Sequence, residues 1–265
     1  MLRRVRRLEG MAVGSDPVIR TRALWKTYGT GGSTVHAVRG IDLVVEPGEF
    51  VALMGPSGCG KSTLLHLLGG LDRPTSGQVE VDGQRLDELG ESARAVLRRR
   101  TVGFVFQAYN LVPNLTVADN VELPGVLAGR SRPDVAGRRE QLLATLGIVD
   151  RADALPSQLS GGQQQRAAIA RALINTPTVL LGDEPTGNLD SASGVQVLDL
   201  LRALHAQGQC LVVVTHDPGV ASHAQRVVFL RDGRIVDQLH PSAPGDRDAM
   251  LARMALIEPA PAAEA

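Results

Sequence analysis

One segment of the chain has the residue types and spacing needed to hold a polyphosphate. Residues 55–62 read Gly-Pro-Ser-Gly-Cys-Gly-Lys-Ser, a glycine-rich loop that ends in Lys and a hydroxyl residue. Glycines let backbone N–H groups wrap phosphates without Cβ clashes, and a following helix N-terminus adds a favourable dipole. We expect Lys61 to reach the β- and γ-phosphates, Ser62 to offer its hydroxyl to Mg²⁺, and Thr63 to lie near the α-phosphate. The candidate nucleotide-binding residues are Gly55, Pro56, Ser57, Gly58, Cys59, Gly60, Lys61, Ser62 and Thr63.

A second segment ends in two adjacent acids. Residues 178–184 read Thr-Val-Leu-Leu-Gly-Asp-Glu, an apolar strand pattern whose last side chains point to opposite faces. We expect Asp183 to hold Mg²⁺ through its water shell and Glu184 to polarise the attacking water. His216 follows another apolar strand pattern and is expected to bond the γ-phosphate and orient the water. The alternatives are a solvated acidic turn and a structural histidine, and the phosphate loop upstream disfavours both.

Two further polar sites stand outside these strand ends. Gln107 follows a third apolar strand pattern, where its amide is expected to touch Mg²⁺ or water. Residues 159–166 read Leu-Ser-Gly-Gly-Gln-Gln-Gln-Arg. Ser160, Gly161 and Gly162 at the start of a helix form an anion-binding site without a lysine, with Ser160 also acting as N-cap. One chain needs only one phosphate-binding site for its own nucleotide. The second site therefore predicts contact with the nucleotide of another subunit, and hence a homodimer with composite sites.

The elements that position these residues alternate between strands and helices. The hydrophobic pattern predicts strands over 41–45, 50–54, 77–82, 102–106, 178–181, 211–215, 227–230 and 234–236, and helices over 62–68, 91–100, 135–146, 163–173, 191–204 and 218–224. Turns and short helical segments between 107 and 158 predict an inserted helical lobe. The expected fold is α/β: a P-loop NTPase core with a mainly parallel sheet, an antiparallel β subdomain and an inserted helical subdomain at about 111–158. The expected division is a flexible basic tail over 1–17, the ATPase domain over 18–240 and a partly disordered extension over 241–265.

Composition limits the classes of function. The chain has 265 residues, of which 43% are hydrophobic and 21% charged, so wholesale disorder and coiled coil are disfavoured. Lys+Arg and Asp+Glu both number 28, so the formal net charge is zero. The chain therefore has no overall positive charge that would attract nucleic acid. Two cysteines are too few for a disulfide framework and fit a reducing compartment. We interpret Cys59 as a small filler, the alternative being an exposed thiol of low pKa.

Membrane and targeting signals are weak. No stretch approaches the roughly 20 apolar residues of a membrane span. The basic start over 1–7 lacks a following apolar core, which argues against a signal peptide. We expect a solvated tail there, or translation that begins at Met11, and a second disordered tail over 258–265. The expected location is the cytoplasm.

The residues resemble the ATP-binding cassette (ABC) ATPases from about Val18 to Gln238, and the unaltered signature Leu159-Ser-Gly-Gly-Gln163 is the feature that separates this family from other P-loop proteins. The resemblance implies that Tyr28 stacks on adenine, its alternative being a strand-edge aromatic. It further implies that Gln107 couples the nucleotide to the helical lobe, and that Ser160 and Gly162 contact the partner's γ-phosphate. Asp190, in the segment 188–190, then belongs to the nucleotide site, and His216 is the switch histidine.

Several longer segments of the sequence resemble the macrolide-export and lipoprotein-release type of this family. The segments that carry it are 68–77, 103–107, 110–116, 160–166 and 183–191. Gly182 and Ala167 depart from the usual alanine and β-branched residue, and neither puts the function in doubt. The resemblance implies ATP and Mg²⁺ as cofactors, a homodimer, and a separate FtsX-like transmembrane permease through which alone the chain meets the inner face of the cell membrane.

Three alternatives remain beside a transporter ATPase. A mechanotransmission ATPase would drive a permease-like protein that transports nothing, and its local sequence would be nearly the same. A repair or chromosome-maintenance ATPase would need a coiled-coil insertion, zinc cysteines or a basic surface. A small-molecule phosphotransferase would need a substrate lid. The sequence offers none of these last features and leaves the substrate open.

Overall fold

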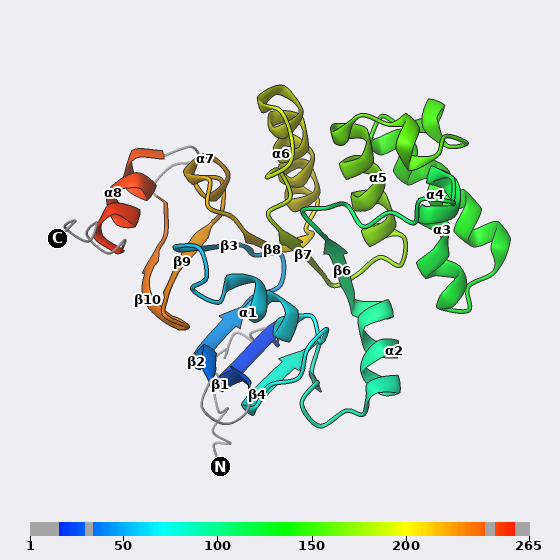
Figure 1. The fold of residues 1–265 in the computed structure, drawn as a ribbon. Helices are drawn as coiled ribbons and strands as arrows, with labels where there is room; N and C mark the ends of the chain where they lie inside the picture. Colours follow the sequence, from blue (N-terminus) through cyan, green and yellow to red (C-terminus); the bar gives the residue numbers. More distant parts are fainter. Residues whose placement is uncertain (1–15, 30–33, 242–246, 258–265) are drawn as a thin grey trace, which may run out of the picture.

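The computed structural model describes residues 16–29, 34–241 and 247–257 (Figure 1). A six-stranded sheet in the order β10-β9-β3-β8-β7-β6 forms its centre. All neighbours in this sheet pair in parallel except β9 and β10, which form an antiparallel hairpin. Every residue of β3 and of β8 is buried, as expected for parallel strands covered on both faces. The strands are β3 (Phe50–Met54), β6 (Val102–Val105), β7 (Val179–Asp183), β8 (Cys210–Val214), β9 (Arg226–Arg231) and β10 (Arg234–Leu239).

A second sheet is antiparallel and has the order β2-β1-β4-β5. One apolar cluster joins it to helix α1 (Lys61–Leu68) and to one face of the central sheet. Helix α1 is therefore buried between the two sheets (Figure 1), which fixes the phosphate loop that precedes it. The strands are β1 (Ile19–Tyr28), β2 (Val35–Val45), β4 (Ser76–Val81) and β5 (Gln84–Arg85).

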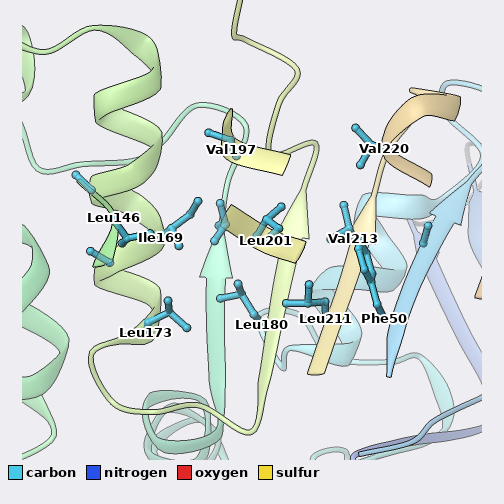
Figure 2. Packing of buried hydrophobic residues seen from close by; sticks show 14 of the residues in the cluster. Phe50, Leu146, Ile169, Leu173, Leu180, Val197, Leu201, Leu211, Val213 and Val220 are labelled. Atoms are coloured by element: carbon cyan, nitrogen blue, oxygen red, sulfur yellow. The ribbon is translucent and has the colours of Figure 1, made fainter. Parts of the chain in front are cut away.

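A helical lobe projects from one side of the central sheet (Figure 1). Thr116 caps its first helix through a capping box with Asp119, and Ser131 caps the second, where a proline stands in the first turn; both are standard start signals. Helix α5 joins the lobe to the core because Ile169 and Leu173 pack in the main apolar cluster (Figure 2). The elements are α3 (Val117–Leu127), α4 (Arg132–Thr145), the short 3₁₀ turns Val149–Arg151 and Pro156–Gln158, and α5 (Gly161–Leu173).

Helices α2, α6 and α7 complete the α/β core. Figure 2 shows Val197 and Leu201 of α6 and Val220 of α7 in the same cluster as Phe50 and Leu211 of the sheet. The expected mainly parallel sheet, antiparallel β subdomain and inserted helical lobe are thus confirmed. The bounds are α2 (Glu91–Thr101), α6 (Ser191–Ala206) and α7 (Pro218–Ala221).

The structure differs from the sequence prediction near the C-terminus. The helix predicted over 218–224 ends at Ala221, and the last strand continues to Leu239. An unpredicted helix, α8 (Arg247–Ile257), lies beside α7 and buries Met250 and Ile257 against the core. Arg253 pairs with Asp237 of β10 at 3.0 Å. Of the basic tail predicted over 1–17, residues 1–15 lie outside the described residues, as does the whole tail predicted over 258–265. Within the described ranges, no helix is long and apolar enough to span a membrane.

Candidate functional site

The phosphate loop leaves β3 and enters α1 through a backbone that only glycine fits at two positions. Gly60 has φ +100°, and a Cβ there would lie 2.1 Å from the Ala37 carbonyl oxygen. A Cβ on Gly55 would lie 2.1 Å from the carbonyl oxygen of Leu230. The loop is therefore packed against β2 and β9, which hold its N–H groups in place for an anion.

Lys61 is the buried cation of this loop, with 8% of its surface exposed. Its Nζ donates to the carbonyl oxygens of Gly55 and Pro56, both at 2.8 Å. These bonds hold the ammonium group across the mouth of the loop, where phosphate oxygens could replace the carbonyls. Cys59 is buried, and burial raises the pKa of its thiol in spite of the nearby Lys61 charge. This placement favours the filler interpretation of Cys59.

A cleft of about 400 Å³ opens beside the loop. Its walls include Ser57, Gly58, Gly60, Lys61, Ser62, Thr63 and Glu184, as the sequence suggested. Residues 35–37 and 39 of β2, and the Asp232-Gly233 turn between β9 and β10, also line it. The sequence gives no sign of these residues, because β2 reaches the loop only through the packing of the two sheets. The Asp-Gly pair is a recognisable hairpin signal, but it does not indicate a ligand.

Ser62 and Asp183 meet at the bottom of the loop. The hydroxyl of Ser62 donates to Asp183 Oδ1 at 2.9 Å. A hydroxyl and a carboxylate are oxygen donors of the kind Mg²⁺ prefers, with water and phosphate oxygens completing its shell. No cluster of three or more His, Cys, Asp or Glu residues suited to a metal occurs in the described parts of the chain. This donor set fits Mg²⁺ held together with a nucleotide better than a metal caged by protein alone.

Glu184 and His216 come together because their strands are neighbours. Asp183 at the end of β7 is paired with Val214 at the end of β8, so the residues that follow each strand emerge at one edge. The Glu184 N–H donates to the Val214 carbonyl oxygen at 2.9 Å, and Glu184 Oε2 lies 2.7 Å from His216 Nδ1. Glu184 has the unusual φ of +47° for a non-glycine residue, as strained residues at functional sites often do. A carboxylate oriented by an imidazole at the mouth of a phosphate loop can polarise water.

Gln107 lies next to this pair without lining the cleft. Its Nε2 donates to Asn188 Oδ1 at 3.2 Å, and Asn188 Nδ2 donates to the Gln107 carbonyl oxygen at 3.0 Å. A side chain on Gly187 would lie 3.0 Å from Gln107 Nε2 and 3.2 Å from Glu184 Oε2. The loop after β6 is thus joined to the loop between β7 and α6, beside the general-base candidate.

The first turn of α5 is the second anion site that the sequence predicts. Ser160 Oγ accepts from the Gln163 N–H at 3.3 Å, while Gln163 Oε1 accepts from the Ser160 N–H at 3.0 Å. A Cβ on Gly161 would lie 2.9 Å from the Tyr109 hydroxyl, and one on Gly162 would lie 3.0 Å from Ser193 Oγ. Ser160 is an N-cap, as expected, and the turn is tightly packed from below. Residues 160–162 are not among those that line the phosphate-loop cleft.

Tyr28 and Asp190 occupy separate positions. Tyr28 is 42% exposed, and Lys26 Nζ lies 4.7 Å from the centroid of its ring. Its hydroxyl donates to Asp72 Oδ2 at 2.7 Å. Burial and this bond to Asp72 raise the pKa of Tyr28, so the hydroxyl stays protonated. Asp190 caps α6 by accepting from the Ser193 N–H at 2.9 Å. Neither residue lines the phosphate-loop cleft of its own chain.

Known proteins share this architecture. The family model described as ABC transporter matches residues 38–187. An ABC transporter ATP-binding protein of Thermotoga maritima is 50% identical over 212 residues, which cover 80% of this chain and 91% of that protein. The macrolide export ATP-binding/permease protein MacB of Hyphomonas neptunium is 46% identical over 250 residues, 94% of this chain. The chain spans only 39% of the length of that MacB protein.

Solved structures agree with the sequence relatives. The ATP-binding cassette MJ0796, a dimer in a post-hydrolysis state bound to ADP and Pi, superposes with a TM-score of 0.79 at 40% sequence identity. The match covers 85% of this chain and 99% of that chain. The fold, the phosphate loop and the signature helix therefore agree with the sequence relatives and the solved structures. The chain belongs to the ABC transporter family as an ATP-binding cassette ATPase.

Proposed function

We propose that two copies of this chain enclose two ATP molecules with Mg²⁺, each between the phosphate loop of one copy and the first turn of α5 in the other. Hydrolysis would reopen the dimer and drive a separate FtsX-like transmembrane permease at the inner face of the cell membrane, for export or for extraction of a substrate from the membrane. One observation carries this proposal: of the two candidate anion-binding segments, only the loop with Lys61 lines the cleft, and the capped first turn of α5 does not. The dimeric state of the MJ0796 cassette supports it.

The site residues divide the work of hydrolysis. Ser62 and Asp183 would hold Mg²⁺, which supplies positive charge against the β- and γ-phosphate oxygens when bound. Lys61 would exchange its two carbonyl partners for phosphate oxygens. Glu184, oriented by His216, would accept a proton from the water that attacks the γ-phosphorus, while the bond from that phosphorus to the β–γ bridging oxygen breaks and ADP leaves. The N–H groups of the Ser160 turn would bind the γ-phosphate from the opposite copy.

A groove between α2, β6, α3 and α5 offers a docking place for the permease. Its cavity of about 390 Å³ is lined by apolar Leu71, Phe104, Phe106 and Pro124 and by basic Arg98, Arg99 and Arg171. A short cytoplasmic helix with an apolar face and an acidic residue would fit this lining.

The groove is connected to the nucleotide site. Arg171 Nη2 donates to the Tyr109 carbonyl oxygen at 2.7 Å, and its other terminal nitrogen donates to the Asn110 carbonyl oxygen. Tyr109 and Asn110 lie two and three residues beyond Gln107, which is joined to Asn188 beside Glu184. Movement of the lobe on ATP binding would therefore reach a helix seated in the groove.

Substitution of Tyr28 tests where the adenine ring of ATP binds. We expect Tyr28→Ala to weaken ATP binding about tenfold, because stacking of a base on an aromatic ring contributes roughly 1–3 kcal/mol. Tyr28→Phe keeps the ring and should bind within about threefold of the unchanged protein. Titration of a fluorescent ATP analogue checks both variants. Equal affinities for Tyr28→Ala and Tyr28→Phe would place the adenine elsewhere.

The proposed dimer is tested with the Glu184→Gln variant, because this variant should bind ATP without hydrolysing it. Its mass by light scattering is expected to change from monomer to dimer only when ATP and Mg²⁺ are both added. Adding Ser160→Arg should abolish this change, because a long side chain would occupy the anion site on α5. Ser157→Arg, on the exposed turn just before it, is the matched control and should leave the dimer intact. A monomer in spite of measured ATP binding, or a dimer that tolerates Ser160→Arg, would argue against the composite site.

A further inference from the structure

Gln165 is a buried amide that the proposed mechanism does not use. It lies on α5, two residues beyond the signature segment 159–163, with none of its surface exposed. Its Nε2 donates to the Pro185 carbonyl oxygen at 2.7 Å, while its Oε1 has no hydrogen-bond partner among the described residues. A buried acceptor without a partner costs free energy of folding. An apolar side chain of similar size would fill this space without that cost.

Pro185 immediately follows Glu184 in a tight turn. The Gly187 N–H donates to the Glu184 carbonyl oxygen at 3.0 Å, which closes this turn over residues 184–187. On the side of the sheet, the Glu184 N–H is bonded to Val214. On the side of α5, the Gln165 amide holds the turn through Pro185. The two bonds bracket a residue whose φ of +47° is not one that it would adopt unaided.

We infer that Gln165 is a positioning residue that ties the carboxylate of Glu184 to helix α5. The inference rests on the proposed role of Glu184 as general base. Helix α5 carries Ser160 at its start, the turn proposed to bind the nucleotide of the opposite copy. Through Gln165, a shift of α5 on contact with one nucleotide changes the placement of the base at the other nucleotide. The two composite sites of the dimer are thereby coupled inside each chain.

The test replaces Gln165 by Leu, which has a similar volume and removes both the donor and the orphan acceptor. We expect kcat for ATP hydrolysis to fall about 10- to 100-fold, since a small displacement of a catalytic group has effects of this size. KM for ATP should stay within about twofold, because the phosphate loop is untouched. In the Glu184→Gln background, Gln165→Leu should leave the ATP-dependent dimer unchanged, which shows that α5 is still folded and able to engage nucleotide.

Gln164→Leu is the matched control. Gln164 is the neighbouring residue on the same helix, and its Nε2 donates to the Leu159 carbonyl oxygen at 3.3 Å, away from Glu184. Its kcat should remain near that of the unchanged protein. Gln165→Met provides a second variant of flexible shape and should repeat the loss of kcat. Retained kcat, an equal loss in Gln164→Leu, a rise in KM that accounts for the loss, or unfolding of both Gln165 variants would each overturn the inference. Glu184→Gln that still hydrolyses ATP would instead refute the role of Glu184 itself.

Discussion

Replacing Glu184 by Gln is expected to lower the rate of ATP hydrolysis by about 10³-fold, within the range of roughly 10²–10⁴ that a positioned general base contributes. Gln keeps the size of the side chain but cannot accept the proton of the attacking water. Affinity for ATP should change little, because Lys61 and Ser62 are unaffected. Release of phosphate under steady-state conditions, with ATP binding measured separately, checks both expectations.

Glu140→Gln is the control for this loss. Glu140 lies on α4 with 74% of its side chain exposed, in the helical lobe and away from the strand ends, so its removal should leave hydrolysis unchanged. A Glu184→Gln protein with more than about a tenth of the original rate would show that another group polarises the water. His216 would then be the first candidate, because its Nδ1 is already 2.7 Å from Glu184 Oε2.

The local pattern predicted the chemical residues because each follows an apolar strand at its carboxyl end. Asp183, Glu184 and His216 all lie where the sequence placed them, at the ends of β7 and β8. The sequence did not predict that these two strands are neighbours, and that order is what brings Glu184 to His216. Strand order depends on contacts between distant segments, and no periodicity within either strand carries that information.

Two features of the structure gave no usable signal in the sequence. Helix α8 follows a proline- and glycine-containing segment, and it is stabilised by burying Met250 and Ile257 rather than by a strong apolar stripe. Gln165 stands in a run of three glutamines, and nothing in that run separates a buried amide from an exposed one. The structure buries Gln165 completely. In both cases tertiary packing overrides the local pattern.

The composite-site proposal accounts for the separation of the two candidate anion sites. Lys61 and Ser62 line one cleft, whereas Ser160 and Asp190 are absent from its walls. Both of the latter residues cap helices whose first turns lie next to each other, since Gly162 of α5 closely approaches Ser193 of α6. The neutral hydroxyl of Ser160 caps α5, whereas the carboxylate of Asp190 caps α6. Of these two helix starts, the first turn of α5 is therefore the one suited to a phosphate brought by a second molecule.

Lys61→Ala is expected to weaken ATP binding by at least about 100-fold and to remove hydrolysis with it. Lys61 is one of only two lysines in the chain, and its buried ammonium group is held by two carbonyl oxygens that phosphate oxygens would replace. Hydrogen bonds to charged groups contribute roughly 1.5–3 kcal/mol each, so the loss of two contacts corresponds to at least two powers of ten in affinity. Equilibrium binding of a labelled ATP analogue measures this loss.

The other lysine supplies the control. Lys26 Nζ is 2.6 Å from Asp72 Oδ1 and also lies over the Tyr28 ring, so its charge is already neutralised outside the loop. Lys26→Ala should therefore reduce ATP affinity by no more than a few-fold, through the ring of Tyr28 alone. An equal loss in both variants would mean that overall positive charge, and not the position of Lys61 in the loop, attracts the nucleotide. A Lys61→Ala protein that binds ATP normally would exclude the loop as the phosphate site, and the roles proposed for Ser62 and Asp183 would fail with it.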